Sequence, residues 1–480
     1  MKPAAAALLA KVRDRLAHGG PEEVVEAFSR YLEVQPGDAL AWTDLAGLLL
    51  GLQRVDEALA ACDRALTLEP SQPSALFHRA SMHQKQGRWV ESETLLRQVL
   101  SFAPGRVDAL LALAKARLAQ LDPIEARTIL QQVIQHEPAN LSAHQFLGQV
   151  YYGQGQWTEF HAELERFRRF DPDSKYLVFE AGFENLLRGV MPQGWSQWEA
   201  RLDVPGCVGP ERTFTEPRWQ GESFEGKTLL VHYEQGLGDT LMLIRYLPLV
   251  KARGGRVVLL VQPQLAYLVT TCAGIDQVVP QGMPLPPFDL QVSLYSLPAV
   301  FQTSLDTIPA DIPYLGVPRQ VSNAESIAAA LAASEGRVRI GLAWAGFSGH
   351  ARDAERSIQA ARLEPLGALP GVAWHGFQMG RADAPSLPGY VSLAPLLTSF
   401  SDTAYALTGM DLVITVDTAL AHLAGALGIP ALLLVTYAPD FRWMLDRDDS
   451  PWYPTLRIYR QPVPGDWDSV IRQVVTDLSA

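Results

Sequence analysis

Five prolines recur at a constant interval in the first part of the sequence. They are Pro36, Pro70, Pro104, Pro138 and Pro172, and each follows the previous one by 34 residues. A period of this length is typical of tandem arrays of helical hairpins, because one hairpin cannot bury its apolar face and must stack on its neighbours. The period therefore predicts an α-solenoid here rather than an ordinary globular domain.

The residues between these prolines keep the same spacing. Small side chains, expected where two helices approach closely, follow the prolines at Ala46, Ala80, Ala114, Gly148 and Gly182. A second small position holds Ala58, Ser92 and Ala126 and fails at Phe160. Each proline ends the second helix of its unit, because it lacks an N–H and fixes φ. The pattern resembles the tetratricopeptide repeat (TPR) and predicts about five repeats, with a partial sixth at residues 175–189.

The composition is that of a globular chain. Hydrophobic residues make up 48% of the 480 residues, and no apolar run approaches the ~20 residues that span a bilayer. The net charge of −12, without a run rich in Lys or Arg, disfavours nucleic acid as a partner. Three widely spaced cysteines, Cys62, Cys207 and Cys272, predict neither a disulfide framework nor a zinc site, and favour a cytoplasmic location. The apolar stretch at residues 3–10 is expected to begin a helix rather than to be a signal peptide, since charged residues follow at once.

The repeat pattern gives way to a segment rich in Trp, Pro and Gly. We therefore assign the TPR array to residues 1–190 and a packed connector to residues 191–227. Trp195, Trp198 and Trp219 are large hydrophobic side chains that need a surface to lie on. They are expected to bind the array to the region that follows.

Beyond residue 227 strands and helices alternate. Short apolar runs predict strands at 228–233, 256–261, 339–345, 372–377, 411–416 and 430–435, and residues 236–251 are expected to form a helix. Alternation of this kind is typical of parallel sheets with right-handed crossovers. The prediction is two Rossmann-like halves, at residues 228–325 and 326–480, which face a cleft. Ligands of such folds bind at the carboxyl ends of the strands.

A first candidate motif lies at the end of the first predicted strand. Residues 234–240 read Glu-Gln-Gly-Leu-Gly-Asp-Thr, a glycine-rich turn between a strand and a helix. Glycines let the backbone approach a ligand, and the start of a helix offers N–H groups to an anion. Asp239 is placed to accept a proton from a substrate. The alternative is an ordinary turn in which Asp239 only caps the helix.

A second motif occupies the loop after the strand at 339–345. It spans residues 344–357 and contains His350, Arg352, Asp353 and Arg356. Arginine binds phosphate oxygens through two parallel hydrogen bonds. No lysine follows Lys251, so arginine or backbone must bind any phosphate in the C-terminal half. The alternative is a solvated charged loop.

A third motif follows the strand at 411–416. Asp417 ends the strand, and a helix that begins at Thr418 points its positive end towards the expected cleft, a suitable site for a diphosphate. His422 lies one turn further, on the same side of the helix as Thr418. The alternative is that Asp417 or Thr418 only caps the helix and that His422 is a core residue.

These motifs together resemble a known enzyme family. Residues 416–430 are similar to the D-T-x-x-x-H-L-A-x-A-x-G-x-P signature of the heptosyltransferase-like glycosyltransferases of family 9, which have the GT-B fold, and residues 234–240 resemble the Gly-x-Gly-Asp loop of that family. Nearly the whole chain is similar to bacterial fusions of TPR arrays with such enzymes, including those implicated in flagellin O-glycosylation. The loop at Trp344 resembles their W-x-G-N-x-x-H-x-x-D-x-x-R-S pattern.

The resemblance implies roles for individual residues. Asp239 matches the catalytic base. The donor-binding candidates are Trp344, His350, Arg356, Ser357, Gln378, Asp417, Thr418, Ala419 and His422, and those of the loop near the acceptor are Glu234, Gln235, Gly236, Gly238 and Thr240. Two departures from the family concern the donor. Phe347 stands where the fusions have Asn, and the donor-site lysine of heptosyltransferases is absent.

The resulting hypothesis is a glycosyltransferase that needs neither a metal nor another cofactor. Its partners would be a nucleotide-sugar, held by Arg356 and the amides after Asp417, and a protein acceptor that the TPR groove delivers to Asp239. The resemblance makes flagellin a candidate acceptor. One alternative is an adaptor whose enzyme domain has lost turnover, for which Phe347 would be a mark of decay. Another is an enzyme of lipopolysaccharide core synthesis, which the scarcity of basic residues disfavours.

Overall fold

The computed structural model describes residues 3–204, 207–208, 214–350 and 352–479. Packing divides the chain into two compact units. The first contains residues Met1–Tyr152, Gln156–Phe170 and Ser348–Ala354, and the second contains Gly153–Gly155, Asp171–Phe347 and Glu355–Ala480. This division falls before the boundary at residue 190 that the repeat period indicates, so the domain boundaries stay a prediction.

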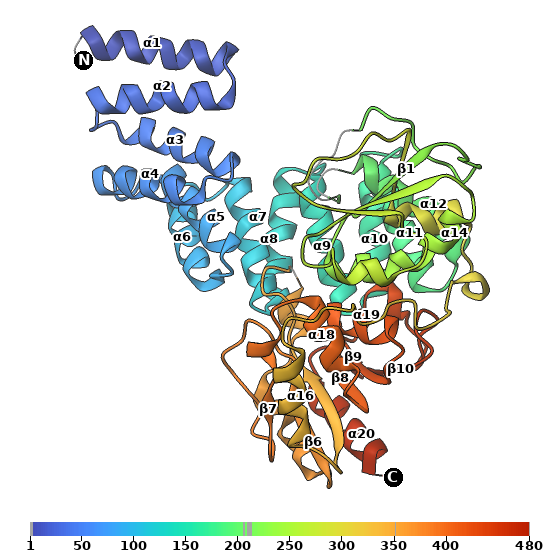
Figure 1. The fold of residues 1–480 in the computed structure, drawn as a ribbon. Helices are drawn as coiled ribbons and strands as arrows, with labels where there is room; N and C mark the ends of the chain where they lie inside the picture. Colours follow the sequence, from blue (N-terminus) through green and yellow to red (C-terminus); the bar gives the residue numbers. More distant parts are fainter. Residues whose placement is uncertain (1–2, 205–206, 209–213, 351, 480) are drawn as a thin grey trace. The chain divides into compact units, whose positions relative to one another are not determined.

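The first unit is a stack of helical hairpins (Figure 1). Its helices are α1 (Pro3–His18), α2 (Pro21–Val34), α3 (Ala39–Gly51), α4 (Val55–Leu68), α5 (Pro73–Lys85), α6 (Trp89–Phe102), α7 (Val107–Ala119), α8 (Pro123–His136), α9 (Leu141–Gly153) and α10 (Trp157–Arg168). Consecutive helices pack in pairs, α3 on α4, α5 on α6 and α7 on α8. No helix in the described ranges has both the length and the apolar content needed to cross a membrane.

The small residues of the period lie where these helices touch. Ala46, Ala80 and Ala114 are fully buried, and so are Ala58 and Ala126 at the second small position. The first set comes from the first helix of each hairpin and the second set from the second helix. Larger side chains at these contacts would push the helices apart. The α-solenoid that the proline period predicts is confirmed.

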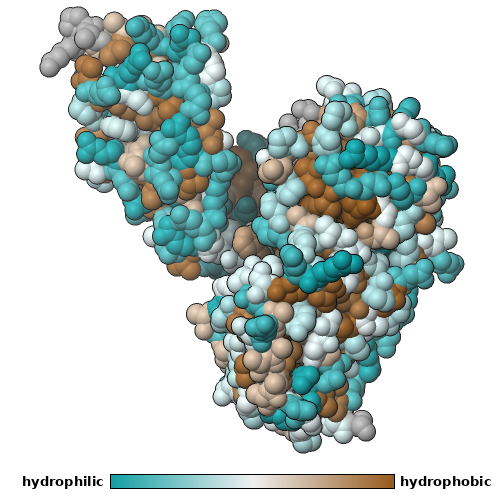
Figure 2. Space-filling view, in the orientation of Figure 1, coloured by the Kyte–Doolittle hydropathy of each residue, from teal (hydrophilic) through white to brown (hydrophobic). Residues whose placement is uncertain are grey.

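Charged side chains of the first unit pair on its surface, where hydrophilic residues predominate (Figure 2). Arg117 of α7 contacts Glu93 of α6 at 2.9 Å and Glu125 of α8 at 2.7 Å. Arg97 contacts the same two glutamates at 2.8 and 2.6 Å. The four side chains thus link three successive helices with charges that stay accessible to water.

One ionic pair of the first unit is buried. His144 Nδ1 lies 2.6 Å from Glu163 Oε1, and His144 Nε2 lies 2.8 Å from the carbonyl oxygen of Pro138. Both ring nitrogens face acceptors, so the imidazole must be protonated on both. Burial opposes the charge, but Glu163 and the Pro138 carbonyl outweigh it, and the pKa of His144 is raised.

The last helix pair that follows the repeat period belongs to the second unit. It consists of α11 (Lys175–Leu187) and α12 (Met191–Trp198). A Cβ on Gly182 would lie 2.7 Å from the backbone nitrogen of Trp198, so the small residue of the period lets the two helices meet. Trp195 and Trp198 pack on Phe441 with ring centroids 5.6 and 5.0 Å apart. These tryptophans therefore anchor the helix pair to the α/β region of the same unit, and the expectation that they bind the array to that region stays a prediction.

Two parallel sheets form the rest of the second unit. The first has the strand order β3 (Gln277–Pro280), β2 (Arg256–Val261), β1 (Thr228–His232) and β4 (Leu290–Ser293). The second has the order β10 (Leu456–Arg460), β9 (Ala431–Val435), β8 (Leu412–Val416), β5 (Val338–Ala343), β6 (Val372–Gly376) and β7 (Val391–Ser392). Every pair within both sheets is parallel. The α/β region is confirmed and is consistent with a GT-B-like domain.

The structure corrects two details of the sequence analysis. The helix expected at 236–251 is interrupted, because α13 (Leu237–Leu243) passes through a 3₁₀ turn into α14 (Leu247–Lys251). Pro248 has no N–H to continue the helical hydrogen bonds, which accounts for the interruption. The strand expected at 339–345 ends at Ala343, so Trp344 already lies in the following loop.

Candidate active site

The first and third motifs meet in the structure although they follow strands of different sheets. Helix α13 begins after β1, and helix α19 (Ala419–Ala426) begins after β8, and the two helices pack on each other. A Cβ on Gly238 would lie only 2.7 Å from Cδ2 of His422. Gly238, which the sequence analysis placed near an acceptor, thus permits the close contact between α13 and α19.

Asp239 lies at this junction and accepts three hydrogen bonds. Its Oδ2 accepts from the N–H of Gly236 at 2.7 Å, which caps α13, and its Oδ1 accepts from the hydroxyl of Tyr295 at 2.7 Å. Arg442 forms an ion pair with the same Oδ1. A carboxylate offers about four lone-pair sites, so about one stays available. The side chain is 17% exposed, which leaves that site within reach of a substrate.

Arg442 lies in η8 (Phe441–Trp443), a short turn after β9. Its Nη1 contacts Asp440 at 2.5 Å, and its Nη2 donates to both Asp239 and Tyr295. Burial opposes its charge, yet the surrounding groups, Asp440 foremost, raise the pKa of Arg442 well above the usual value. For Tyr295, burial itself raises the pKa, so this side chain donates as a neutral phenol.

Asp417 follows β8 on the other side of the junction. Burial and then the neighbouring charge of Asp440 raise the pKa of Asp417, while Arg442 and Arg356 act in the opposite direction. Arg356 Nη1 donates to the main-chain oxygen of Asp417 at 3.1 Å. Thr418 caps α19, since its hydroxyl accepts from the N–H of Leu420 at 3.3 Å. Arg356 and the start of α19 are therefore neighbours.

His422 is buried behind the start of α19. Its Nδ1 is hydrogen-bonded to the hydroxyl of Tyr453 at 2.9 Å, and its ring stacks on Trp443 at a centroid distance of 5.3 Å. Burial, aided by Arg442 and Arg245, lowers the pKa of His422 well below the usual value. A neutral, enclosed imidazole fits the core-residue alternative better than direct contact with a charged ligand.

The remaining residues of the first motif hold the turn in place. Glu234 binds Arg201 through two hydrogen bonds of 2.7 Å and accepts from Ser293 at 2.5 Å. The amide of Gln262 donates to the main-chain oxygen of Gln235 at 2.9 Å and accepts from the hydroxyl of Thr240 at 2.9 Å. The turn that carries Asp239 is thus braced on both sides.

Three candidates of the C-terminal half shape the backbone around Trp344. Gln378 Oε1 accepts from the N–H groups of Trp344 and Ala345 at 2.9 and 2.8 Å. The hydroxyl of Ser357 accepts from the N–H of Gly346 at 3.0 Å. The Trp344 ring belongs to the buried core of the second sheet. These residues fix the backbone of residues 344–346, directly after β5.

His350 lies further along the loop that follows Trp344. It is exposed and lies in the segment Ser348–Ala354, which is part of the first unit. Its Nδ1 accepts from the N–H of Arg352 at 3.2 Å, a contact within the loop itself. Arg356 of the second motif contacts Asp417, through its hydrogen bond to the main-chain oxygen of that residue.

The sequence analysis missed Tyr295, Arg442 and Asp440, although a signal for them exists. Tyr295 follows the carboxyl end of β4, and the other two follow that of β9. The expectation that ligands bind beyond these strand ends covers all three positions. Arg442 also stands between two large aromatic residues, Phe441 and Trp443, where a charge requires buried partners.

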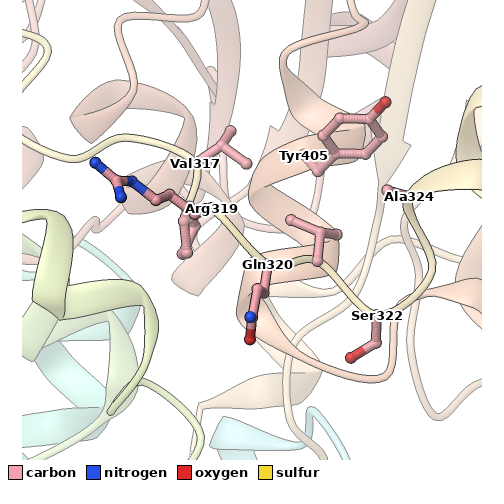
Figure 3. Close-up of a pocket in the computed structure, with 8 residues that line it drawn as sticks. Val317, Arg319, Gln320, Ser322, Ala324 and Tyr405 are labelled. Carbon is pink, nitrogen blue, oxygen red and sulfur yellow. The ribbon is translucent and has the colours of Figure 1, made fainter.

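Two cavities of the second unit lie away from these residues. They border α16 (Ala324–Ala332) and α18 (Phe400–Leu407) and have volumes of about 510 and 410 Å³. Figure 3 shows the first, with Arg319, Gln320 and Ser322 on one side and Tyr405 on the other. No motif residue lines either cavity.

Comparisons with protein families match separate parts of the chain to two kinds of family. Residues 9–73 and 117–177 match tetratricopeptide repeat models, and residues 381–460 match the model of glycosyltransferase family 9 (heptosyltransferase). Protein FlbA of Caulobacter vibrioides is 25% identical over 321 residues, which are 61% of this chain and 53% of that protein. The chain thus spans about half the length of this relative.

Several solved structures resemble part of the chain. A tetratricopeptide repeat protein from Parabacteroides merdae is 15% identical, with a TM-score of 0.37, over 43% of this chain and 80% of its own. The MamA protein is 14% identical, with a TM-score of 0.33, over 35% of this chain and 92% of its own. The family models alone show tetratricopeptide repeats in the N-terminal part of the chain and a glycosyltransferase family 9 domain in its C-terminal part.

Proposed function

We propose that the protein transfers a sugar from a nucleotide-sugar to a hydroxyl group of a protein acceptor. The family 9 domain supports glycosyltransferase activity. Donor and acceptor classes are proposed from the arrangement of the site and from the repeats. The resemblance to TPR-glycosyltransferase fusions makes flagellin the acceptor to test first.

One observation carries the proposal, namely the meeting of Asp239 with the start of α19. Asp239 offers a carboxylate with a free lone pair, and α19 places its N-terminal, positive end beside Arg356. The two come from strand ends of different sheets and are joined through Arg442 and the contact of Gly238 with His422. A proton acceptor next to an anion site is the pair of groups that glycosyl transfer requires.

The proposed step balances as follows. The oxygen of the acceptor hydroxyl forms a bond to the anomeric carbon, and its proton passes to Asp239. The bond from that carbon to the phosphate oxygen breaks, and the nucleoside diphosphate leaves with the electron pair. The N–H groups of α19 and the guanidinium of Arg356 stabilise the departing charge, so the proposal requires no metal.

The repeats are proposed to supply the acceptor. Stacked hairpins form extended surfaces that bind other proteins. An acceptor held by the first unit would present its hydroxyl to the second at high effective concentration. Asp239 would then act on a hydroxyl that is already in place.

A second candidate is an adaptor without turnover. The observation in its favour is that three donors already occupy Asp239 in this structure. Phe347, which replaces the asparagine of similar fusions, is exposed and offers no polar group to a donor. The adaptor would keep the repeat unit as its working part.

Thermal unfolding with UDP, GDP, ADP and CMP separates the two candidates. A nucleotide at a hundred times its Kd stabilises a protein by ~2.7 kcal/mol. We expect one of them to raise the Tm of the wild-type protein and of Arg256→Ala, an exposed control in the same unit, but not that of Arg356→Ala. No shift with any nucleotide would contradict the enzyme and favour the adaptor.

The stabilising nucleotide then identifies the donor for a turnover assay. Release of that nucleotide from its sugar conjugates is measured for the wild type and for Asp239→Ala. We expect the variant to bind the nucleotide and to lose turnover by at least about a hundredfold, the usual contribution of a general base. Equal turnover in both proteins would remove Asp239 from the mechanism.

A further inference from the structure

We propose that Arg442 is a further residue of the donor site. Before a donor binds, Asp239 holds the Arg442 side chain; when a donor binds, Arg442 moves to the donor diphosphate. The inference rests on the proposed function, and it adds a residue and an order of events. Donor binding would release Asp239 before the acceptor arrives.

The hydrogen bonds of Arg442 are incomplete. Arginine has five N–H groups. Nη1 of Arg442 contacts Asp440, and Nη2 contacts Asp239 and Tyr295. Its Nε is buried and has no hydrogen-bond partner among the residues that the structure describes. Because the side chain is only 9% exposed, water does not readily supply the missing partner.

A second buried arginine of the same unit shows what a purely structural role looks like. Arg201 is fully buried, and its Nε and Nη2 bind the two oxygens of Glu234 at 2.7 Å each. Its Nη1 donates to Glu199 at 2.7 Å. Every nitrogen of this side chain therefore has a partner. Arg442 meets its carboxylates one oxygen at a time and leaves Nε unused.

The position of Arg442 fits a phosphate ligand. Its charge opposes the rise that burial causes in the pKa of Asp417, and it adds to burial in lowering the pKa of His422, so it acts on groups at the start of α19. Trp443, the next residue, stacks on His422 of that helix. A guanidinium with an unused Nε presents the planar fork that binds phosphate oxygens in pairs. The positive end of the α19 dipole favours the same anion.

The charges around Arg442 explain why it would have to change partners. Three carboxylates, Asp239, Asp417 and Asp440, share two guanidinium groups, Arg442 and Arg356. A diphosphate that entered without a rearrangement would meet an excess of negative charge. If Arg442 turns to the diphosphate, Asp239 loses its cationic partner, and a carboxylate without such a partner accepts a proton more readily. Donor binding would thereby prepare the base.

The proposal predicts competition between Asp239 and a bound anion for Arg442. The probes are inorganic pyrophosphate and the nucleoside diphosphates UDP, GDP and ADP, and the affinities are measured by isothermal titration calorimetry. In Asp239→Asn the competing charge is gone, so we expect about tenfold tighter binding. In Arg442→Ala we expect at least about tenfold weaker binding. The double variant should bind no more tightly than Arg442→Ala.

Two further variants keep the test independent of folding. Asp276→Asn removes an aspartate that contacts Lys251 at 2.6 Å near the surface, and it should leave every affinity unchanged. Arg442→Lys keeps the charge and loses the fork, so it should bind more weakly than the wild type if the protein folds. Near-ultraviolet circular dichroism checks that each variant keeps its tertiary packing.

The outcomes separate the inference from the proposed function. If a nucleotide binds and requires Arg356, but Asp239→Asn and Arg442→Ala leave its affinity unchanged, the donor site stands and the role of Arg442 is refuted. Weaker binding by Asp239→Asn would also refute it, because Asp239 would then position Arg442 rather than compete for it. If neither pyrophosphate nor any nucleotide binds to any variant, both proposals fall.

Discussion

The two units of the molecule differ in where their positively charged side chains lie. In the repeat unit, arginines such as Arg97 and Arg117 pair with glutamates at the surface. In the second unit, Arg201, Arg245 and Arg442 are buried, and among the described residues of the repeat unit no arginine or lysine is. Buried charges are costly unless their partners are in place. The repeat unit can therefore vary its charges freely, whereas the second unit depends on a few of them.

The buried arginines also differ from one another. Arg245 donates to the main-chain oxygens of Met242 and Trp452 and to the hydroxyl of Tyr314, and Arg201 is likewise fully paired. Arg442 alone among the three has a nitrogen without a partner in the described chain. Complete pairing fits a structural role for Arg201 and Arg245, and the unused Nε of Arg442 is the difference on which its proposed role in the donor site rests.

The largest effect is expected for Arg201→Ala. It leaves Glu234 buried without its cation, which should lower the free energy of unfolding by about 3–5 kcal/mol. The control Arg97→Ala removes a pair on the repeat surface and should cost less than about 1 kcal/mol. Urea unfolding followed by circular dichroism measures both. Equal losses would mean that the contrast between the units has no energetic basis.

A smaller effect is expected where α13 meets α19. In Gly238→Ala the new Cβ would lie 2.7 Å from the His422 ring, which Trp443 and Tyr453 hold in place. Overpacking of this kind costs about 1–3 kcal/mol. Gly316→Ala is the control, since nothing lies within 4 Å of its Cβ. A Gly238→Ala protein as stable as this control would show that the helices can separate without loss.

The pair of His144 and Glu163 in the repeat unit is buried, in contrast to the surface pairs of Arg97 and Arg117. Because the pKa of His144 is raised in the folded state, its stabilisation is complete below the unfolded pKa and is lost as the pH rises through the folded pKa. The loss of stabilisation amounts to ~1.4 kcal/mol for each pH unit that separates the folded and unfolded pKa values of His144. Urea midpoints at pH 5.5 and 8.5, followed by helical circular dichroism, test this.

His144→Gln serves as the reference for that measurement. The glutamine keeps a hydrogen bond but cannot titrate, so the difference in midpoint between the two pH values should shrink. An undiminished pH dependence would assign the effect to another group of the repeat unit.

The smallest effects are expected at exposed hydrophobic residues, whichever unit carries them. Phe347→Asn in the second unit and Phe102→Asn in the first replace side chains that are 77% and 57% exposed. Both should change the free energy of unfolding by no more than about 0.5 kcal/mol. Chemical denaturation of the two variants in parallel is the measurement. A large loss of unfolding free energy for Phe347→Asn alone would mean that the stability of the second unit also depends on exposed residues, and not only on its buried charges.

Much of the fold follows from periodicity in the sequence. The 34-residue spacing predicts the hairpins because every repeat meets the same packing constraint, which is why Ala46, Ala80 and Ala114 are all buried. The strand at 256–261 is found with the predicted bounds as β2, since a run of apolar residues between turn signals has few alternatives. Strands with weaker patterns, such as β3 and β10, were not predicted.

The site could be predicted only in part, because its contacts join distant positions. The motif around Asp239 is recognisable from its glycines after a predicted strand, and that around Asp417 from its position at the end of another. The partner of Asp239, however, is 203 residues away at Arg442. Nothing in the local sequence indicates that the turn after β9 packs against α13. For the same reason, His422 was assigned to the donor site from its spacing, and its burial under Trp443 and Tyr453 emerges only from the packing.

The packing of the helix pair α11 and α12 limits where recombination could replace repeats of this chain during evolution. It keeps the spacing of the repeats, yet its aromatic side chains belong to the second unit, where Trp198 touches both Phe179 and Phe441. A recombination that replaced the repeats up to residue 190 would leave Trp198 without Phe179. A junction before Asp171 would keep these contacts. The last repeat-like hairpin is therefore part of the second unit, and repeats upstream of it can be exchanged without loss of this packing.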